Sequence, residues 1–126
     1  DAVVSRGLGD VYKRQRQEGS DEIFLLSYAM IRKFRDSYFQ GDVDKSLPDV
    51  SPIQGDLSGM PPALFTVGTR DLLLDDSLFM FGRWLSYGSN AEIIIVPGAD
   101  HAFNAFPSET TTLVENKINE FLQSVL

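Results

Sequence analysis

The sequence contains no cysteine and only one histidine, His101, and both facts narrow the chemistry open to the chain. Without cysteine there are no disulfide bonds, no thiolate nucleophile and no cysteine-bound metal. A single histidine fits poorly with a zinc site of the usual histidine-rich kind. We therefore expect no metal and no cofactor.

Positive charge and long apolar runs are also scarce. The 126 residues include 11 basic and 18 acidic side chains, a net charge of −7, which argues against nucleic acid or an anionic membrane as a partner. No apolar run approaches the roughly 20 residues that a membrane-spanning helix needs. The first residues show no apolar signal-peptide core. We expect a cytoplasmic protein with no membrane span, and leave open both a signal upstream of residue 1 and the oligomeric state.

The first 16 residues differ in composition from the rest. They carry four basic and two acidic side chains, a net charge of +2, and show no sustained helical or strand period. Residues 1–15 resemble translated sequencing-adaptor sequence, and the alternative is a natural basic tail. We divide the chain into a non-native or disordered head, 1–16, and a portion of one domain, 17–126.

The remaining sequence predicts an α/β fold. Two short apolar runs rich in β-branched and aromatic residues flank a segment with helical periodicity, which is typical of a βαβ unit with parallel strands. Amphipathic periods on either side of this unit predict two further helices. The expected elements are a helix near Asp21–Phe39 capped by Ser20, a strand near Ala63–Val67, a helix near Asp75–Tyr87, a strand near Glu92–Val96 and a helix near Ser108–Val125.

Each predicted strand is followed by a glycine and, three residues later, by a polar residue. Asp71 follows Gly68, and His101 follows Gly98. Because parallel strands end at the same sheet edge, where ligands of open α/β sheets bind, the two side chains should meet there. A carboxylate bonded to an imidazole can orient a general base. Two alternatives stay open: Asp71 as a helix N-cap with His101 as a polar loop residue, or both as structural residues of a non-catalytic binding or interaction module.

One stretch of sequence is specific enough to suggest a family. Ser51-Pro52-Ile53, then D-L-S-G-M-P-P-A-L-F-T-V-G-T-R-D-L-L-L-D-D from residue 56, Y-G from residue 87 and P-G-A-D-H-A-F from residue 97 resemble the C-terminal part of α/β-hydrolases of the hormone-sensitive-lipase-like esterase branch. The resemblance covers about residues 49–126. It implies that the chain is the C-terminal βαβα part of an α/β-hydrolase parallel sheet with flanking helices.

The resemblance also implies roles for particular residues. In that branch a serine, an aspartate and a histidine follow in this order as a catalytic triad. The acid falls on Asp71 and the base on His101, while Leu73, Ala102 and Phe103 fall where substrate-binding residues are expected.

The sequence departs from the family pattern in four places. Leu72 replaces the usual proline after the acid, and Ala102 replaces the usual glycine after the histidine. The nucleophile motif G-x-S-x-G and the oxyanion loop of the H-G-G-G type are both missing.

The resemblance therefore implies a truncated reading frame from a carboxylesterase-type serine hydrolase that acts on a small acyl ester. The chain would carry only the acid and base and be inactive alone. A serine peptidase of the prolyl-oligopeptidase type is the alternative within the enzymes, and acyl-chain preference and physiological substrate stay open.

Overall fold

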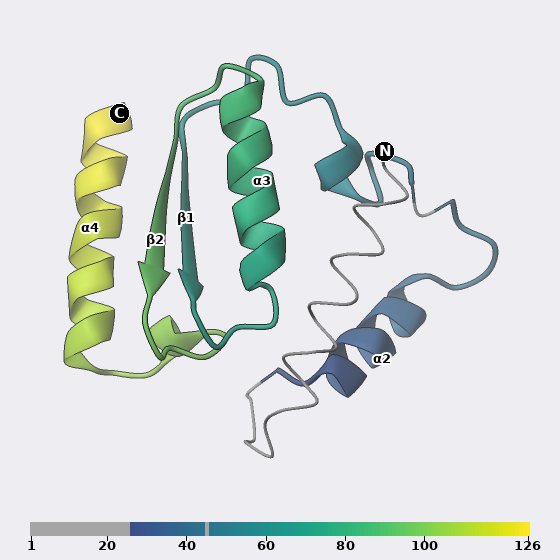
Figure 1. Cartoon of the computed structure of the whole chain (residues 1–126), viewed down its shortest axis with the longest axis horizontal. Helices are drawn as coiled ribbons and strands as arrows, with labels where there is room; N and C mark the ends of the chain where they lie inside the picture. Colours follow the sequence, from purple (N-terminus) through teal and green to yellow (C-terminus); the bar gives the residue numbers. More distant parts are fainter. Residues whose placement is uncertain (1–25, 45) are drawn as a thin grey trace.

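The computed structural model describes residues 26–44 and 46–126, so the predicted head, 1–16, and the predicted cap Ser20 lie outside the described residues. Helices alternate with the two strands along the described ranges (Figure 1). The elements are α2 (Tyr28–Tyr38), the 3-10 helix η1 (Pro52–Gln54), β1 (Ala63–Gly68), α3 (Leu74–Ser86), β2 (Ala91–Val96), the 3-10 helix η2 (Phe103–Ala105) and α4 (Glu109–Val125).

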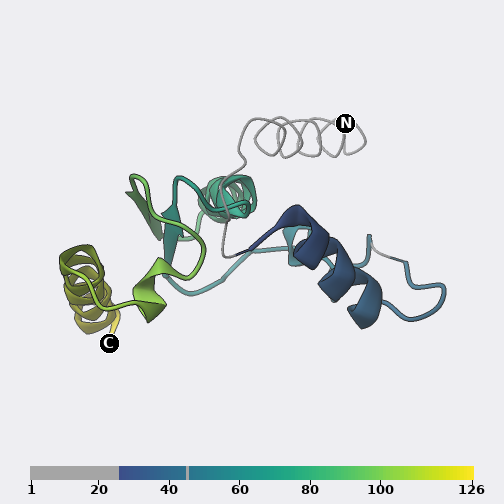
Figure 2. The same cartoon turned by 90° about the horizontal axis from the view of Figure 1, so that it is seen from below.

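Strands β1 and β2 pair in parallel, with a register that runs from Ala63 opposite Ala91 to Gly68 opposite Val96. The predicted parallel βαβ unit is therefore confirmed, and each strand is one residue longer than expected. Helices α3 and α4 lie on opposite sides of this sheet (Figures 1 and 2). The described chain thus forms an α/β fold of three layers, and both strands end at the same edge of the sheet.

Aromatic side chains join β1 to α3. The ring of Phe65 meets the ring of Phe81 edge-on at 6.2 Å and that of Trp84 at 5.8 Å between centroids. The indole Nε1–H of Trp84 also donates to the carbonyl of Pro61 at 2.9 Å, which satisfies the polar end of the ring. This side of the sheet is consequently fixed against α3 by both apolar and polar contacts.

The side of the sheet that faces α4 is packed less closely. A cavity of about 510 Å³ lies between them, lined on the sheet side by residues that include Leu64 and Ile94 and on the helix side by residues that include Phe121. Several large apolar side chains are also well exposed, such as Phe34 and Leu113, each at 59%. The described chain buries only a small apolar core, as expected for so short a length. That core comprises Leu26, Leu57, Val67, Leu72, Leu74, Val96 and Val114.

The helix predicted near Asp21–Phe39 falls partly outside the described residues, which start at Leu26, and α2 begins two residues after that point. Helix α2 starts at Tyr28, where the side chain of Ser27 accepts a hydrogen bond from the backbone N–H of Met30 at 3.2 Å. The prediction of a helix near Asp21–Phe39 is therefore wrong at Leu26 and Ser27, because Ser27 supplies the N-cap and starts the helix itself. The views of Figures 1 and 2 place α2 apart from the sheet.

The other two helices lie close to their predicted bounds. Helix α3 is shifted by one residue toward the N-terminus, and Ser108 caps α4 by accepting the N–H of Thr111 at 3.0 Å. In the ranges that the structure describes, no helix combines the length and apolarity needed to cross a bilayer.

Candidate active site

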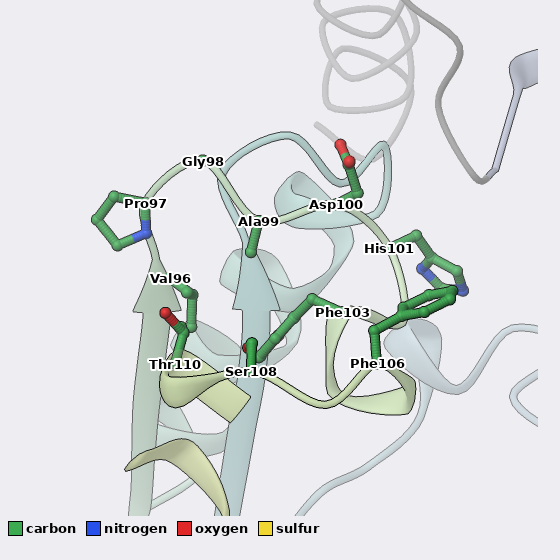
Figure 3. Close-up of a pocket in the computed structure, with 10 residues that line it drawn as sticks. All are labelled: Val96, Pro97, Gly98, Ala99, Asp100, His101, Phe103, Phe106, Ser108 and Thr110. Carbon is green, nitrogen blue, oxygen red and sulfur yellow. The ribbon is translucent and has the colours of Figure 1, made fainter. Parts of the chain in front are cut away.

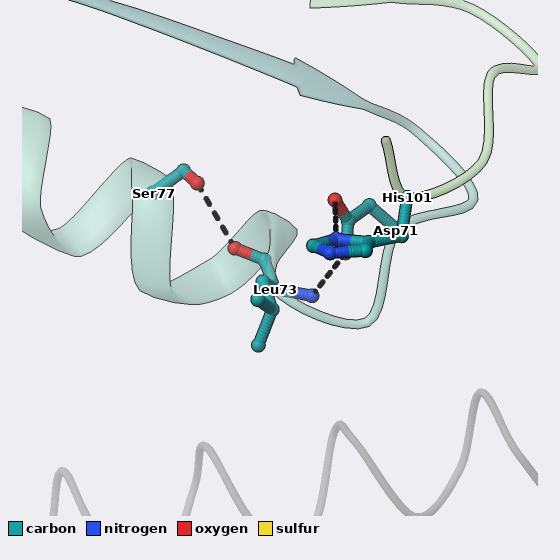
Figure 4. A network of polar contacts seen from close by, with 4 residues as sticks. All are labelled: Asp71, Leu73, Ser77 and His101. Atoms are coloured by element: carbon teal, nitrogen blue, oxygen red, sulfur yellow. Dashed lines mark hydrogen bonds and ion pairs between the residues drawn. The ribbon is translucent and has the colours of Figure 1, made fainter. Parts of the chain in front are cut away.

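Asp71 and His101 meet at the carboxyl edge of the sheet, each on the loop that follows its strand (Figure 4). Nδ1 of His101 lies 2.9 Å from Oδ2 of Asp71. An ionised carboxylate only accepts hydrogen bonds, so Nδ1–H is the donor to it. The contact expected from the two loops is therefore confirmed.

The loop around Asp71 holds its carboxylate from several directions. The residue is only 7% exposed, and its second oxygen, Oδ1, accepts the backbone N–H of Leu73 at 2.8 Å. Its own N–H donates to the carbonyl of Gly68 at 3.2 Å. The N-cap of α3 is Leu73, whose side chain makes no capping hydrogen bond. The alternative of Asp71 as the N-cap is therefore wrong. Asp71 instead fixes the turn before the helix and aims its other oxygen at the imidazole.

His101 is partly accessible, with 36% of its side chain exposed. Its second ring nitrogen, Nε2, has no hydrogen-bond partner within residues 26–44 and 46–126. Ala102, the next residue, adopts the left-handed conformation with φ 56° and ψ 29°. The chain turns sharply there and continues into η2, so the imidazole stays at the edge of the sheet with Nε2 available to a reacting group.

The other aspartates near this edge are engaged elsewhere. Asp75 and Asp76 lie in the first turn of α3, where acidic side chains interact favourably with the helix dipole. Asp100 pairs with Arg70, whose Nε donates to Oδ1 at 3.0 Å. Asp71 is thus the carboxylate that contacts the histidine.

A cavity of about 320 Å³ opens beside His101 (Figure 3). Of the three residues predicted to bind substrate, Phe103 lines this cavity with the neighbouring Phe106, whereas Leu73 and Ala102 are not part of its lining. Leu73 instead contributes the backbone N–H that holds Asp71. The structure therefore brings one of the three beside the histidine and into the cavity wall.

Sequence reasoning missed two contacts that shape this site. Thr111 is 5% exposed, and its hydroxyl contacts the carbonyls of Phe106 at 2.8 Å and Phe103 at 3.3 Å, which ties the turn after His101 to the start of α4. Gly68 approaches Ala99 so closely that a Cβ there would lie 2.6 Å from the Ala99 carbonyl carbon. The glycine at the end of the first apolar run was the only sequence signal for this close approach.

The arrangement can perform proton transfer. An imidazole oriented through Nδ1 can take a proton at Nε2 from a hydroxyl group, and the buried carboxylate stabilises the resulting imidazolium. The described residues contain no group of three or more histidine, aspartate or glutamate side chains that could hold a metal ion.

Comparisons with known proteins point to one family. The sequence profile of the alpha/beta hydrolase fold family matches residues 6–105, a range that begins within the 1–16 head. An esterase of Acinetobacter venetianus is 42% identical over 53 residues, which are 42% of this chain and 18% of that protein.

Solved structures agree with this match. The hyperthermophilic esterase from the archaeon Pyrobaculum calidifontis superposes with a TM-score of 0.78 at 28% identity, over 88% of this chain and 38% of its own. The HSL homologue EstE7 from a metagenome library gives a TM-score of 0.63 at 29% identity, over 67% of this chain and 30% of its own. The chain therefore spans well under half the length of these relatives.

Proposed function

The chain belongs to the alpha/beta hydrolase fold family, and on that premise we propose that it is the C-terminal part of a carboxylesterase-type serine hydrolase. Asp71 is the acid and His101 the base of its triad. The observation that carries the proposal is the 2.9 Å contact between Nδ1 of His101 and Oδ2 of a nearly buried Asp71, at the carboxyl edge of a parallel sheet. The names of the similar proteins, esterases, favour an acyl ester as substrate.

In this proposal each residue has one task. Asp71 keeps the imidazole hydrogen on Nδ1 and stabilises the positive charge that forms on the ring. His101 removes the proton of a serine hydroxyl at Nε2 and then returns it to the leaving alcohol. The serine and the oxyanion donors belong to a part of the enzyme that this sequence does not contain, because no G-x-S-x-G motif occurs in it.

A hybrid enzyme tests the proposal directly. Residues 49–126 of this chain would replace the corresponding segment of the Acinetobacter venetianus esterase, which then supplies the missing serine and oxyanion loop. We expect the hybrid to hydrolyse a short-chain aryl ester, and His101→Ala in it to lower kcat by about 10⁴ or more. Each hybrid is checked for folding by circular dichroism.

Two results would count against the proposal. A folded hybrid without ester hydrolysis would favour the non-catalytic module, in which Asp71 and His101 are structural. Hydrolysis of a peptide amide in preference to the ester would favour the peptidase alternative. The control within the hybrid is Asp76→Asn, which removes an exposed carboxylate from the first turn of α3.

A further inference from the structure

A row of contacts joins the two loops that carry Asp71 and His101. The backbone N–H of Thr69 donates to the carbonyl of Val96 at 3.0 Å, and the Thr69 hydroxyl accepts the N–H of Gly98 at 2.8 Å. The N–H of Arg70 then donates to the carbonyl of Ala99 at 3.0 Å. These contacts advance along both loops in the same direction, toward the acid and the base.

The next contact in the row is an ion pair. Nε of Arg70 lies 3.0 Å from Oδ1 of Asp100, and these two residues immediately precede Asp71 and His101. Both pairs join residues that are 30 positions apart. The ion pair is therefore the side-chain contact that adjoins the acid–base contact on both loops.

Asp100 would otherwise be a competitor for the imidazole. It is the chain neighbour of His101 and carries the same kind of carboxylate as Asp71. The guanidinium of Arg70 engages that carboxylate, as arginine commonly does through its N–H groups. With Asp100 held by Arg70, the carboxylate of Asp71 remains the acceptor for Nδ1–H.

We propose that Arg70 and Asp100 are positioning residues, an ion pair that keeps Asp71 rather than Asp100 on Nδ1 of His101. The inference rests on the proposed roles of Asp71 and His101. The pair acts by engaging Asp100 and by holding the two loops in register beside the 2.9 Å hydrogen bond. Its side chains are 38% and 40% exposed, so its effect is moderate and is weakened by salt. Exposed ion pairs of this kind shift an equilibrium by up to about fivefold.

The single histidine makes the test unambiguous. In the complete 126-residue chain, the two ring-nitrogen signals of a ¹⁵N NMR spectrum belong to His101 alone and report which nitrogen carries the hydrogen. The spectra are recorded at about pH 9, where an ordinary imidazole is neutral. The variants are Arg70→Gln, Asp100→Asn, the two together, and Asp71→Asn as the reference for loss of the acid. Arg35→Gln is the matched control, since it removes another exposed arginine that pairs with an aspartate, Asp36, at 2.8 Å.

We expect the unaltered chain to hold the hydrogen mainly on Nδ1 and Asp71→Asn to abolish that preference. Arg70→Gln should lower the ratio of the Nδ1–H to the Nε2–H form by about two- to fivefold, because it frees Asp100 to compete. The double variant should give a ratio closer to that of the unaltered chain than Arg70→Gln gives, because it also removes the competing carboxylate of Asp100. Arg35→Gln should leave the ratio unchanged. In 1 M salt the ratio in the unaltered chain should fall toward the value measured for Arg70→Gln.

Different outcomes separate the two proposals. If Asp71→Asn changes the ratio while Arg70→Gln and salt do not, the positioning pair is wrong and the acid–base pair stands. If Asp71→Asn has no effect, both fall together. Additive losses for Arg70→Gln and Asp100→Asn would show that each acts through its charge alone, which also overturns the positioning pair.

Fluorescence of Trp84, the only tryptophan, shows whether each variant is folded. If Arg70→Gln unfolds the chain, the salt series on the unaltered chain tests the positioning pair instead. A ratio that does not change with salt would overturn it.

Discussion

Gly68 at the end of β1 lies directly against Ala99 in the loop after β2, and a Cβ on Gly68 would stand 3.0 Å from the Cβ of Ala99 and 2.6 Å from its carbonyl carbon. Because the obstacle is backbone, a larger residue at position 68 has to move one loop away from the other. The close approach therefore decides how Asp71 and His101 face each other.

Gly68→Ala should destabilise the fold by about 1–3 kcal/mol, the usual cost of forcing extra volume into a packed site. The matched control is Gly82→Ala within α3, where nothing lies within 4 Å of an added Cβ. That substitution should stabilise the helix by roughly 0.5–1 kcal/mol. Denaturant unfolding followed by Trp84 fluorescence measures both values. Equal effects for the two alanines would show that the loops yield without strain.

Asp71→Asn in the hybrid enzyme should lower kcat by up to ~10⁴, because an amide can hold the imidazole in the wrong tautomer. Asp75→Asn is the control, since that residue lies in the first turn of α3 and its charge there is worth about 0.3–1 kcal/mol. The values of kcat and KM for the two variants check this. Similar losses in kcat would mean that Asp71 is not the orienting acid.

Ala102→Gly should stabilise the fold by up to about 1 kcal/mol. A left-handed conformation costs a residue with a Cβ roughly 1–2 kcal/mol, which glycine avoids, but glycine also raises the conformational entropy of the unfolded chain and so offsets part of the gain. Ala102 is the one non-glycine residue with positive φ in the described ranges. Ala105→Gly in η2 should instead destabilise. Thermal unfolding of the two variants compares them, and a lower melting temperature for Ala102→Gly would contradict the strain.

The chain alone should hydrolyse a short-chain aryl ester no faster than free imidazole does. An acid and a base without a placed nucleophile and oxyanion donors have nothing to activate. Initial rates are measured beside His101→Ala as the control. Turnover well above that of imidazole, abolished in His101→Ala, would mean that the chain supplies its own nucleophile.

The turn before β1 gives a prediction for acid pH. The hydroxyl of Ser58, and then its backbone N–H at 2.9 Å, hold the pKa of Asp56 below its usual 3.8. A lowered pKa in the folded state adds stability that is complete above the unfolded value and is lost as the pH falls through the folded value. Ser58→Ala should move the pKa of Asp56 up toward 3.8, and ¹³C NMR of the carboxyl group measures it. An unchanged titration would show that the hydroxyl does not contribute, and Ser124→Ala, on α4, serves as control.

Periodicity and turn residues were enough to predict the βαβ unit and the meeting of Asp71 with His101. The runs around β1 and β2 are short and apolar, and parallel strands bring their ends together whatever the side chains between them. The start of α2 was not predictable in the same way, because Ser20 and Ser27 both have the chemistry of an N-cap. The choice between them depends on packing that the sequence pattern does not contain.

Contacts across the site were harder to predict than its two main residues. The Gly68–Ala99 approach and the Arg70–Asp100 pair join positions about 30 residues apart, and both depend on the exact path of two loops. Thr111 carried a weaker signal, since Ser108 and Thr111 have the spacing of a helix cap, but its bonds to the turn after His101 arise only from the fold.

Asp71 and His101 lie within a single βαβ unit, on the loops that end its two strands. A crossover between two related genes that falls upstream of β1 would therefore pass both residues to the recombinant together, with their mutual geometry intact. In the proposed enzyme, selection can therefore act on the segment that supplies the serine separately from the segment that supplies Asp71 and His101.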